Sequence, residues 1–335
     1  MAEYSRSEAK AWLRTLSGYL LIVTTPYNAD GSIDVDGLRR NVALSLQIPG
    51  VTGLYVGSNY QEFWTLTLDE RKQITETIVD AAAGRLKVMV GVTSTCARDS
   101  QELARAAERS GADALMLWPP YYGSRDDTGV LHYFESVAEV SDLAICSYST
   151  TVSEVGFYIT PELATRMVAI DTFSGLKEAS RSLSGYAEMV SAVGDTIVVS
   201  CPLEEYTLFG LATFGRSHVP SVLLGSSRPF YVQNTRYPYC QHFASALEAG
   251  NVENAAAALR PILWAANRLH NRFINRGGHN VALVKYITEL LGMAGGPVRA
   301  PISAASEVDK EDAREVLSEI GSVDISSTAA VAVNV

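Results

Sequence analysis

The segment Phe173-Ser174-Gly175-Leu176-Lys177-Glu178-Ala179-Ser180 combines an apolar run with one of the six lysines of the chain. The run predicts a short buried strand, with Lys177 near its carboxyl end. A lysine in this position can extend into solvent and pair with Glu178. Alternatively, its amine is held in a dry pocket, loses its proton easily and attacks a ketone to form a Schiff base. The residues around this segment in the fold decide between the two interpretations.

Strand-like runs alternate with helical segments on both sides of this segment. Besides the strand that contains Lys177, we expect strands at 19–25, 53–56, 87–92, 114–118, 143–147, 196–200 and 219–224. Repeated strand–helix units predict a parallel sheet of the α/β class, and eight of them fit a closed (β/α)₈ TIM barrel. A doubly wound open sheet is the alternative, but no GxGxxG pattern follows the first strand.

The alternation also sets the expected domain organisation. We expect an N-terminal helix in residues 1–17, the catalytic barrel in 18–249 and an added C-terminal helical layer in 250–321. Residues 322–335 are small and weakly patterned, which predicts a flexible tail.

Composition excludes several classes of function. The chain of 335 residues has a net charge of −10 and no basic run, so nucleic acid and anionic membrane surfaces are unexpected partners. Its four cysteines form no CxxC pair, which indicates free thiols rather than a disulfide framework or a zinc site. The N-terminus is charged where a signal peptide is apolar, and no apolar run approaches membrane-spanning length. We therefore expect a soluble cytoplasmic protein that needs no metal.

Chemistry in a (β/α)₈ barrel takes place at the carboxyl ends of the strands. The residues expected there are Gly57, Ser58 and Asn59 on strand 2, Tyr121 and Tyr122 on strand 4, Tyr148 on strand 5, Lys177 on strand 6, and Pro220, Ser221 and Gly225 on strand 8. Schiff-base chemistry needs these types of residue. The lysine is the nucleophile, a phenol moves protons, and N–H groups in a Gly-Ser turn hold a small carboxylate.

Other residues near the strand ends have structural interpretations. Glu204 and Glu205 begin a helix and complement its dipole, and Arg228 is interpreted as a surface arginine, with contact to an anion as the alternative. The aromatic residues Tyr60, Phe63 and Trp64 are interpreted as packing, with an acceptor pocket as the alternative.

Several motifs in order resemble the dihydrodipicolinate synthase/N-acetylneuraminate lyase family of class I, pyruvate-type aldolases, over about residues 18–302. These motifs are Thr24-Thr25-Pro26-Tyr27, Gly57-Ser58-Asn59-Tyr60-Gln61-Glu62, Pro120-Tyr121-Tyr122, Tyr148-Ser149-Thr150-Thr151, Gly175-Leu176-Lys177-Glu178-Ala179-Ser180, the segment from Asn280 to Lys285, and Gly295-Gly296-Pro297-Val298-Arg299-Ala300-Pro301. The fifth of them matches the family's Schiff-base motif, and the joint order is more specific than any single motif.

The resemblance implies roles for individual residues. Lys177 would be the Schiff-base lysine and Tyr148 the proton-relay phenol. Ser58 and Asn59 would lie beside the carboxylate of a 2-oxo acid. Tyr122 would match a tyrosine that reaches the active site of a neighbouring subunit, in a homotetramer built as a dimer of dimers. The resemblance implies neither a metal nor an organic cofactor.

The sequence also departs from the family pattern. The loop from Gly57 to Glu62 is one residue longer and carries Asn59 at its second hydroxyl position. The loop after Tyr148 lacks the usual proline and contains Ser153 and Glu154, but no arginine before Gly156. In dihydrodipicolinate synthases, an arginine there grips the carboxylate of the second substrate. Its absence favours an uncharged aldehyde, either hydroxylated or aromatic.

The sequence thus predicts a Schiff-base aldolase or lyase that acts on pyruvate or another 2-oxo acid and an uncharged aldehyde. The alternatives within the family are a dehydratase, a hydratase-aldolase and dihydrodipicolinate synthase itself. A barrel that only binds a metabolite, as a sensor or assembly subunit, is the alternative from another class. The presence of both Lys177 and Tyr148 argues against that last reading.

Overall fold

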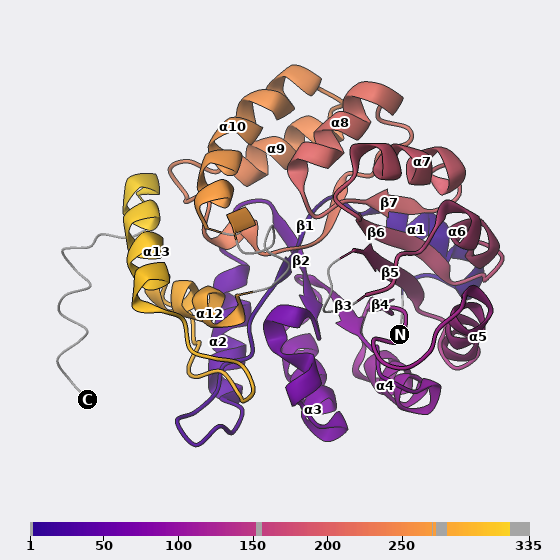
Figure 1. Cartoon of the computed structure of the whole chain (residues 1–335), viewed down its shortest axis with the longest axis horizontal. Coiled ribbons are helices and arrows are strands. Elements are labelled where there is room, and N and C mark those ends of the chain that lie inside the picture. The colour runs from indigo at the N-terminus through magenta and orange to yellow at the C-terminus, as the bar shows by residue number, and fades with distance from the viewer. Residues whose placement is uncertain (1–2, 152–155, 270, 273–279, 322–335) are drawn as a thin grey trace.

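The structure is a computed structural model that describes residues 3–151, 156–269, 271–272 and 280–321. Eight parallel strands form one sheet in the order β7-β6-β5-β4-β3-β2-β1-β8. The sheet curls into a nearly closed barrel with helices outside it (Figure 1), which confirms the predicted TIM barrel. The strands are β1 (Gly18–Ile22), β2 (Val51–Val56), β3 (Lys87–Gly91), β4 (Ala114–Met116), β5 (Ala144–Thr150), β6 (Phe173–Ala179), β7 (Val198–Ser200) and β8 (Val222–Ser226).

One α-helix precedes the first strand, others alternate with the strands, and the rest follow the last strand. They are α1 (Ala9–Thr15), α2 (Val35–Ser45), α3 (Leu68–Ala82), α4 (Ala97–Ser110), α5 (Asp127–Ala138), α6 (Pro161–Met167), α7 (Leu183–Val193), α8 (Glu204–Phe214), α9 (Tyr239–Glu248), α10 (Val252–Arg268), α12 (Val281–Leu290) and α13 (Glu307–Ile320). Side-chain caps set several helix starts. Thr67, for example, accepts a hydrogen bond from the N–H of Glu70 and forms a capping box with it at the start of α3.

The strands differ from the predicted ones mainly at their ends. The first strand ends at Ile22 rather than residue 25, and β8 begins at Val222 rather than residue 219. Pro220 has no N–H to donate to a neighbouring strand, so the β8 ladder begins after it. Every residue of β1, β5, β6 and β8 is buried, as expected for parallel strands that helices cover on their outer face.

Helix α1 packs against the barrel at β5, β6 and β7. Its Leu13 is fully buried, and a Cβ atom at Gly175 of β6 would approach Leu13 to 2.6 Å. Lys10 and Arg14 donate hydrogen bonds to the carbonyl oxygens of Val168 and Gly194. Gly175 therefore allows the N-terminal helix to pack closely on the strand that carries Lys177.

Strands β7 and β8 are the two edges of the sheet, and a side chain bridges them. The hydroxyl group of Ser200 donates to the carbonyl oxygen of Val222 at 2.7 Å and accepts from the N–H of Leu224 at 3.1 Å. Ser200 therefore supplies hydrogen bonds at the seam where the edge strands β7 and β8 meet.

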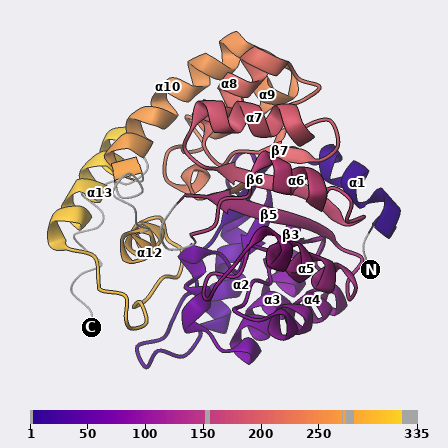
Figure 2. The same cartoon turned by 45° about the vertical axis from the view of Figure 1, so that its right-hand side comes forward.

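The C-terminal helices lie on the side of the barrel away from α1 (Figures 1 and 2). Helix α10 packs on α9 and α8, whereas α12 contacts the 3₁₀ turn η2 (Asn59–Gln61) in the loop after β2. Helix α13 packs on α10 and α12. The C-terminal layer therefore reaches the loop in which Ser58 and Asn59 lie. The predicted flexible tail, residues 322–335, lies outside the described residues.

Candidate active site

Lys177 lies near the carboxyl end of β6, with its side chain inside the barrel and 5% of the residue exposed. Its neighbour in the β5–β6 register is Tyr148. The Nζ atom of Lys177 donates a hydrogen bond to the carbonyl oxygen of Gly225 on β8 at 2.8 Å. The amine is therefore buried and fixed at one end of the barrel, rather than extended into solvent beside Glu178.

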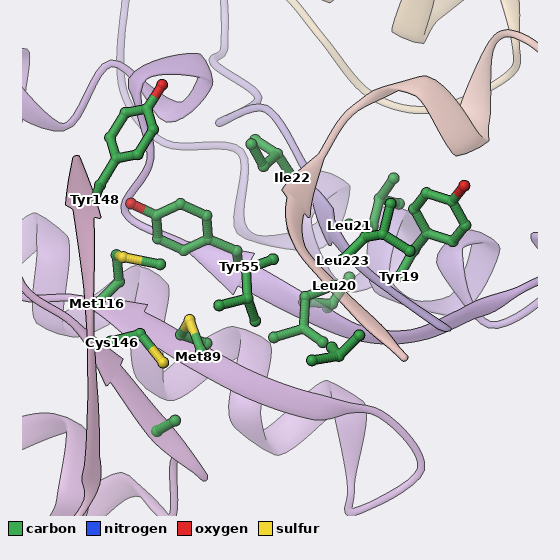
Figure 3. Close-up of a cluster of buried hydrophobic side chains, with 14 of the residues drawn as sticks. Tyr19, Leu20, Leu21, Ile22, Tyr55, Met89, Met116, Cys146, Tyr148 and Leu223 are labelled. Carbon is green, nitrogen blue, oxygen red and sulfur yellow. The ribbon is translucent and has the colours of Figure 1, made fainter. Parts of the chain in front are cut away.

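Aromatic rings surround this amine. Its Nζ atom lies 4.6 Å from the ring centroid of Tyr148 and 5.6 Å from that of Tyr55. Trp118 packs against Tyr148 with the ring centroids 5.1 Å apart. Figure 3 shows Tyr55 and Tyr148 above the sulfur-containing side chains of the barrel interior. The amine thus lies next to two aromatic rings.

Burial changes the proton affinity of the amine. Removal from water lowers the pKa of Lys177 from its ordinary value of 10.5 to about 7, because desolvation disfavours the ammonium form. A large fraction of Lys177 is consequently neutral and nucleophilic near neutral pH. Burial also raises the pKa of Tyr55 well above its ordinary value, so the Tyr55 phenol stays protonated.

A pocket that opens to solvent gives access to Lys177. Ser58 and Asn59 line it from the loop after β2, while Ser226 and Ser227 line it from the end of β8. The hydroxyl oxygen of Ser58 is buried and has no hydrogen-bond partner among the described residues. Because buried polar groups are normally paired, this hydroxyl is suited to a polar ligand group in the pocket.

Gly57 shapes the loop that carries Ser58. Its φ is 76°, in the left-handed region, and a Cβ atom there would approach the carbonyl oxygen of Gly91 to 2.9 Å. The N–H of Gly57 donates to the side-chain oxygen of Gln61, which closes the loop on itself. Gly57 thus has a backbone role, since only glycine fits this turn without strain.

Two arginines also line the pocket. Arg228 is 1% exposed, and its guanidinium contacts the carboxylates of Glu204 and Glu205. It also donates to the side-chain oxygen of Asn271 at 2.9 Å. Burial alone would lower the pKa of Arg228, but the two carboxylates raise it well above its ordinary value. The prediction of a surface arginine was therefore wrong, and Arg228 is a buried, charge-compensated group.

Arg181 follows β6 and has a φ of 67°, in the left-handed region that non-glycine residues rarely adopt. Burial alone would raise the pKa of Glu205. The positive charge of Arg228 and, to a smaller extent, that of Arg181 act in the opposite direction, and the pKa of Glu205 is lowered overall. Arg181, Arg228, Glu204 and Glu205 thus interact electrostatically at one side of the pocket. Their formal charges, two positive and two negative, sum to zero.

A comparison of sequences identifies the family to which this barrel belongs. The sequence profile of the dihydrodipicolinate synthetase family matches residues 15–320. The chain belongs to that family. It is therefore a class I, pyruvate-dependent aldolase or lyase by membership. The resemblance that the ordered motifs predicted is confirmed.

Individual members of the dihydrodipicolinate synthetase family are only distantly similar. The 4-hydroxy-tetrahydrodipicolinate synthase of Methanothrix thermoacetophila is 29% identical over 306 residues, 90% of this chain and 96% of that protein. The enzyme of the same name from Moorella thermoacetica is 31% identical over 303 residues, 90% of this chain and 97% of that protein.

Solved structures of the family share the fold. A crystal structure of dihydrodipicolinate synthase is 25% identical, with a TM-score of 0.77 over 92% of this chain and all (100%) of that chain. A prophage protein of the family from E. coli K12, solved in complex with pyruvate, is 24% identical, with a TM-score of 0.77 over 92% of this chain and 99% of that chain.

Pro220 and Ser221 lie away from the pocket in this family member. Both precede β8, so they are at the amino end of the strand and not at its carboxyl end. The carbonyl oxygen of Ser221 accepts a hydrogen bond from the N–H of Gly18 at the start of β1, and its hydroxyl contacts Arg216. Their predicted substrate-binding role was therefore wrong. Gly225, Ser226 and Ser227 line the pocket from β8 instead.

Tyr122 lies in the loop after β4 and is 79% exposed, outside the pocket that holds Lys177. Its contribution to a neighbouring subunit stays a prediction, as do the homotetramer and the cytoplasmic location. Tyr60 is buried in the hydrophobic core and also lines the pocket, so both interpretations of this residue hold. Phe63 packs edge-on against Trp118, whereas Trp64 is 41% exposed.

Sequence reasoning missed several residues that line the pocket of this enzyme, among them Tyr55, Trp118, Arg181 and Ser227. Tyr55 and Trp118 lie within or just beyond apolar strand runs, where an aromatic residue is typical of core packing. The positive φ of Arg181 leaves no mark in the sequence. For Ser227, the Gly225-Ser226-Ser227 run after strand 8 was a usable signal.

Within residues 3–151, 156–269, 271–272 and 280–321, no group of three or more His, Cys, Asp or Glu side chains is placed to hold a metal ion. In the same part of the chain, no helix has the length and apolar character needed to span a membrane.

Proposed function

We propose that this enzyme forms a Schiff base between Lys177 and the C2 ketone of pyruvate or another 2-oxo acid, and then makes or breaks a carbon–carbon bond to an uncharged aldehyde. The observation that carries the proposal is the amine of Lys177, buried beside Tyr148 with its pKa lowered to about 7. A neutral amine is the form that attacks a carbonyl carbon.

The proposed reaction passes through an imine and an enamine of the 2-oxo acid. The amine adds to C2, and loss of water from the carbinolamine gives a protonated imine. The imine withdraws electrons, so loss of a proton from C3 gives an enamine. In the synthetic direction, C3 of the enamine attacks the aldehyde carbon, and the aldehyde oxygen takes up a proton. Water then hydrolyses the imine and releases the product and Lys177. Cleavage is the reverse of these steps.

We assign proton transfer to Tyr148 because its ring lies against the amine. A phenol can donate to the leaving hydroxyl of the carbinolamine and recover a proton later in the cycle. We assign the carboxylate of the 2-oxo acid to Ser58 and Asn59, both of which line the pocket that holds Lys177. The unpartnered hydroxyl group of Ser58 supports this assignment.

The charges around the pocket support an uncharged aldehyde. Arg228 is compensated by Glu204 and Glu205, and Arg181 lies in the same electrostatic group. A second carboxylate would therefore meet a group with no net positive charge. The hydroxyls of Ser226 and Ser227, together with the rings of Tyr60 and Trp118, are suited to a hydroxylated or aromatic aldehyde. Ser153 and Glu154, on which the same prediction partly depended, lie outside the described residues.

A second candidate is 4-hydroxy-tetrahydrodipicolinate synthase activity, which the names of the curated relatives favour. It would place a charged aldehyde in the same pocket. Arg181, which lines the pocket and follows β6, is then a candidate to hold the second carboxylate.

The test is reductive trapping. Borohydride added with pyruvate reduces the imine to a stable amine, and peptide mass mapping locates the adduct. We expect the adduct on Lys177 and its loss in Lys177→Ala. Lys87→Ala is a matched control, because Lys87 is the first residue of β3 and pairs with Asp113. An adduct on another lysine, or undiminished trapping in Lys177→Ala, would refute the proposal.

A further inference from the structure

The loop that carries Ser58 and Asn59 ends at a buried glutamate. Glu62 is fully buried, and its φ of 57° lies in the left-handed region. A glutamate has no intrinsic preference for this conformation, so its surroundings must hold it there. The contacts of Glu62 show what these surroundings are.

The carboxylate of Glu62 is held by the C-terminal layer. The Nζ atom of Lys285, on α12, lies 2.9 Å from one carboxylate oxygen, and the N–H of Arg299 donates to the other at 2.9 Å. Lys285 is 1% exposed and also donates to the carbonyl oxygen of Pro297. Its amine lies 4.1 Å from the ring centroid of Tyr27. Both charges of the Glu62–Lys285 pair are thus removed from water and have several directional partners.

The same loop connects Glu62 to the pocket through backbone hydrogen bonds. The N–H of Glu62 donates to the carbonyl oxygen of Asn59 at 2.9 Å, and that of Gln61 donates to the carbonyl oxygen of Ser58 at 3.0 Å. The side chain of Gln61 accepts from the N–H of Gly57. A movement of Glu62 therefore moves the backbone that carries Ser58 and Asn59.

A buried ion pair is a weak source of stability, because desolvation of both charges offsets their attraction, and apolar residues often replace such a pair without loss. Its directional contacts do, however, fix one backbone geometry. We propose that Glu62 and Lys285 are positioning residues, which hold Ser58 and Asn59 for recognition of the 2-oxo acid and so make α12 part of substrate binding. This inference rests on the proposed function for its substrate.

The decisive variants are Glu62→Gln and the double variant Glu62→Gln/Lys285→Met. The amide of Glu62→Gln keeps the shape of the side chain but cannot accept hydrogen bonds at both ends, and it leaves Lys285 without its counter-charge. The matched control is Asn41→Ala. Asn41 is buried and also ties the C-terminal region to the barrel, through hydrogen bonds of 2.8 and 2.7 Å with Ala294, but it is on α2 and outside the pocket.

The readouts separate positioning from general stability. We expect Glu62→Gln to raise the pyruvate concentration that half-saturates borohydride trapping by about 10- to 100-fold, while the trapping rate at saturation changes far less. The double variant should show the same rise in the half-saturating pyruvate concentration as Glu62→Gln, even if its melting temperature is higher. Asn41→Ala should lower the melting temperature and keep the half-saturating concentration of the parent. A Glu62→Gln protein that loses only stability would overturn the inference.

Hydrogen exchange gives a readout that needs no substrate. We expect the amides of Gln61 and Glu62 to exchange faster in Glu62→Gln than in the parent or in Asn41→Ala. If the parent protein forms no pyruvate adduct, the proposed function is refuted. The Glu62–Lys285 contact is rejected as the restraint on this loop only if exchange at these two amides is the same in Glu62→Gln as in the parent.

Discussion

The amine of Lys177 and the backbone of Gly225 are in direct contact across the barrel, with 2.8 Å between Nζ and the carbonyl oxygen. Gly225 has a φ of 72°, and a Cβ atom there would approach Nζ of Lys177 to 2.8 Å and the ring of Tyr55 to 2.7 Å. The amine thus donates its hydrogen bond to the backbone of a residue where a side chain does not fit.

Gly225→Ala is therefore expected to slow adduct formation at Lys177 by about tenfold or more, because the amine must leave its position. The measurement is the rate of borohydride trapping at saturating pyruvate. Gly123→Ala is the matched control, since Gly123 also has a positive φ, 91°, but an added Cβ atom there meets nothing within 4 Å. Equal effects of the two substitutions would assign the loss to backbone strain alone.

The lowered pKa of Lys177 predicts a pH profile. Below about pH 7 the amine is protonated and cannot attack, whereas above this value it is neutral. The pH dependence of the trapping rate should therefore rise with pH and level off above about pH 7. A rate that continued to rise through pH 9 would indicate an ordinary lysine.

The same shift predicts an effect on stability. The pKa of Lys177 is about 7 in the folded protein and 10.5 in its ordinary state, so between these values the unfolded chain binds more protons. The free energy of unfolding therefore rises with pH across this window, and the full cost of burying the ammonium is present below it. We expect Lys177→Met to raise the melting temperature at pH 6, with a smaller gain at pH 10. A gain that did not depend on pH would argue against this pKa.

Tyr148→Phe removes the phenol hydroxyl and keeps the ring that packs on Trp118 and the amine. Loss of a general acid or base usually costs about 10²–10⁴-fold in rate. We expect a loss of this size in kcat, with an unchanged melting profile. Steady-state kinetics and circular dichroism measure the two quantities. A kcat close to that of the parent would assign proton transfer to another group.

The charge balance at the pocket predicts the order of acceptors. We expect kcat/KM with pyruvate to be higher for hydroxylated and aromatic aldehydes than for aspartate semialdehyde. Each aldehyde is also tested with Arg181→Met, which removes the positive charge that follows β6. If aspartate semialdehyde is the best substrate and Arg181→Met abolishes that preference, the second candidate function is correct and the prediction of an uncharged aldehyde is wrong.

The sequence was sufficient for the barrel and for the Lys177–Tyr148 pair. Strand periodicity located the strands, and parallel strands bring their carboxyl ends together, so these two residues had to be neighbours once both were placed on β5 and β6. Ser58 and Asn59 could be placed in the pocket for the same reason.

Pro220 and Ser221 were misplaced by an error within this reasoning, because the predicted strand, 219–224, already has them near its amino end, and β8 begins only at Val222. Pairing between distant elements was outside the reach of the reasoning. Arg228 and Glu204 come from different strand–helix units, and nothing in either segment alone indicates that they share a buried contact.

The Ser200 bridge between β7 and β8 has a consequence for how the chain acquires its reactivity. Lys177 on β6 reaches Gly225 on β8 across that seam, so the amine is enclosed only when the seam is closed. In a nascent or partly opened chain the same lysine is solvated and carries its proton, with the modest reactivity of any surface amine. Closure of the barrel at this seam therefore completes the surroundings that lower the pKa of Lys177.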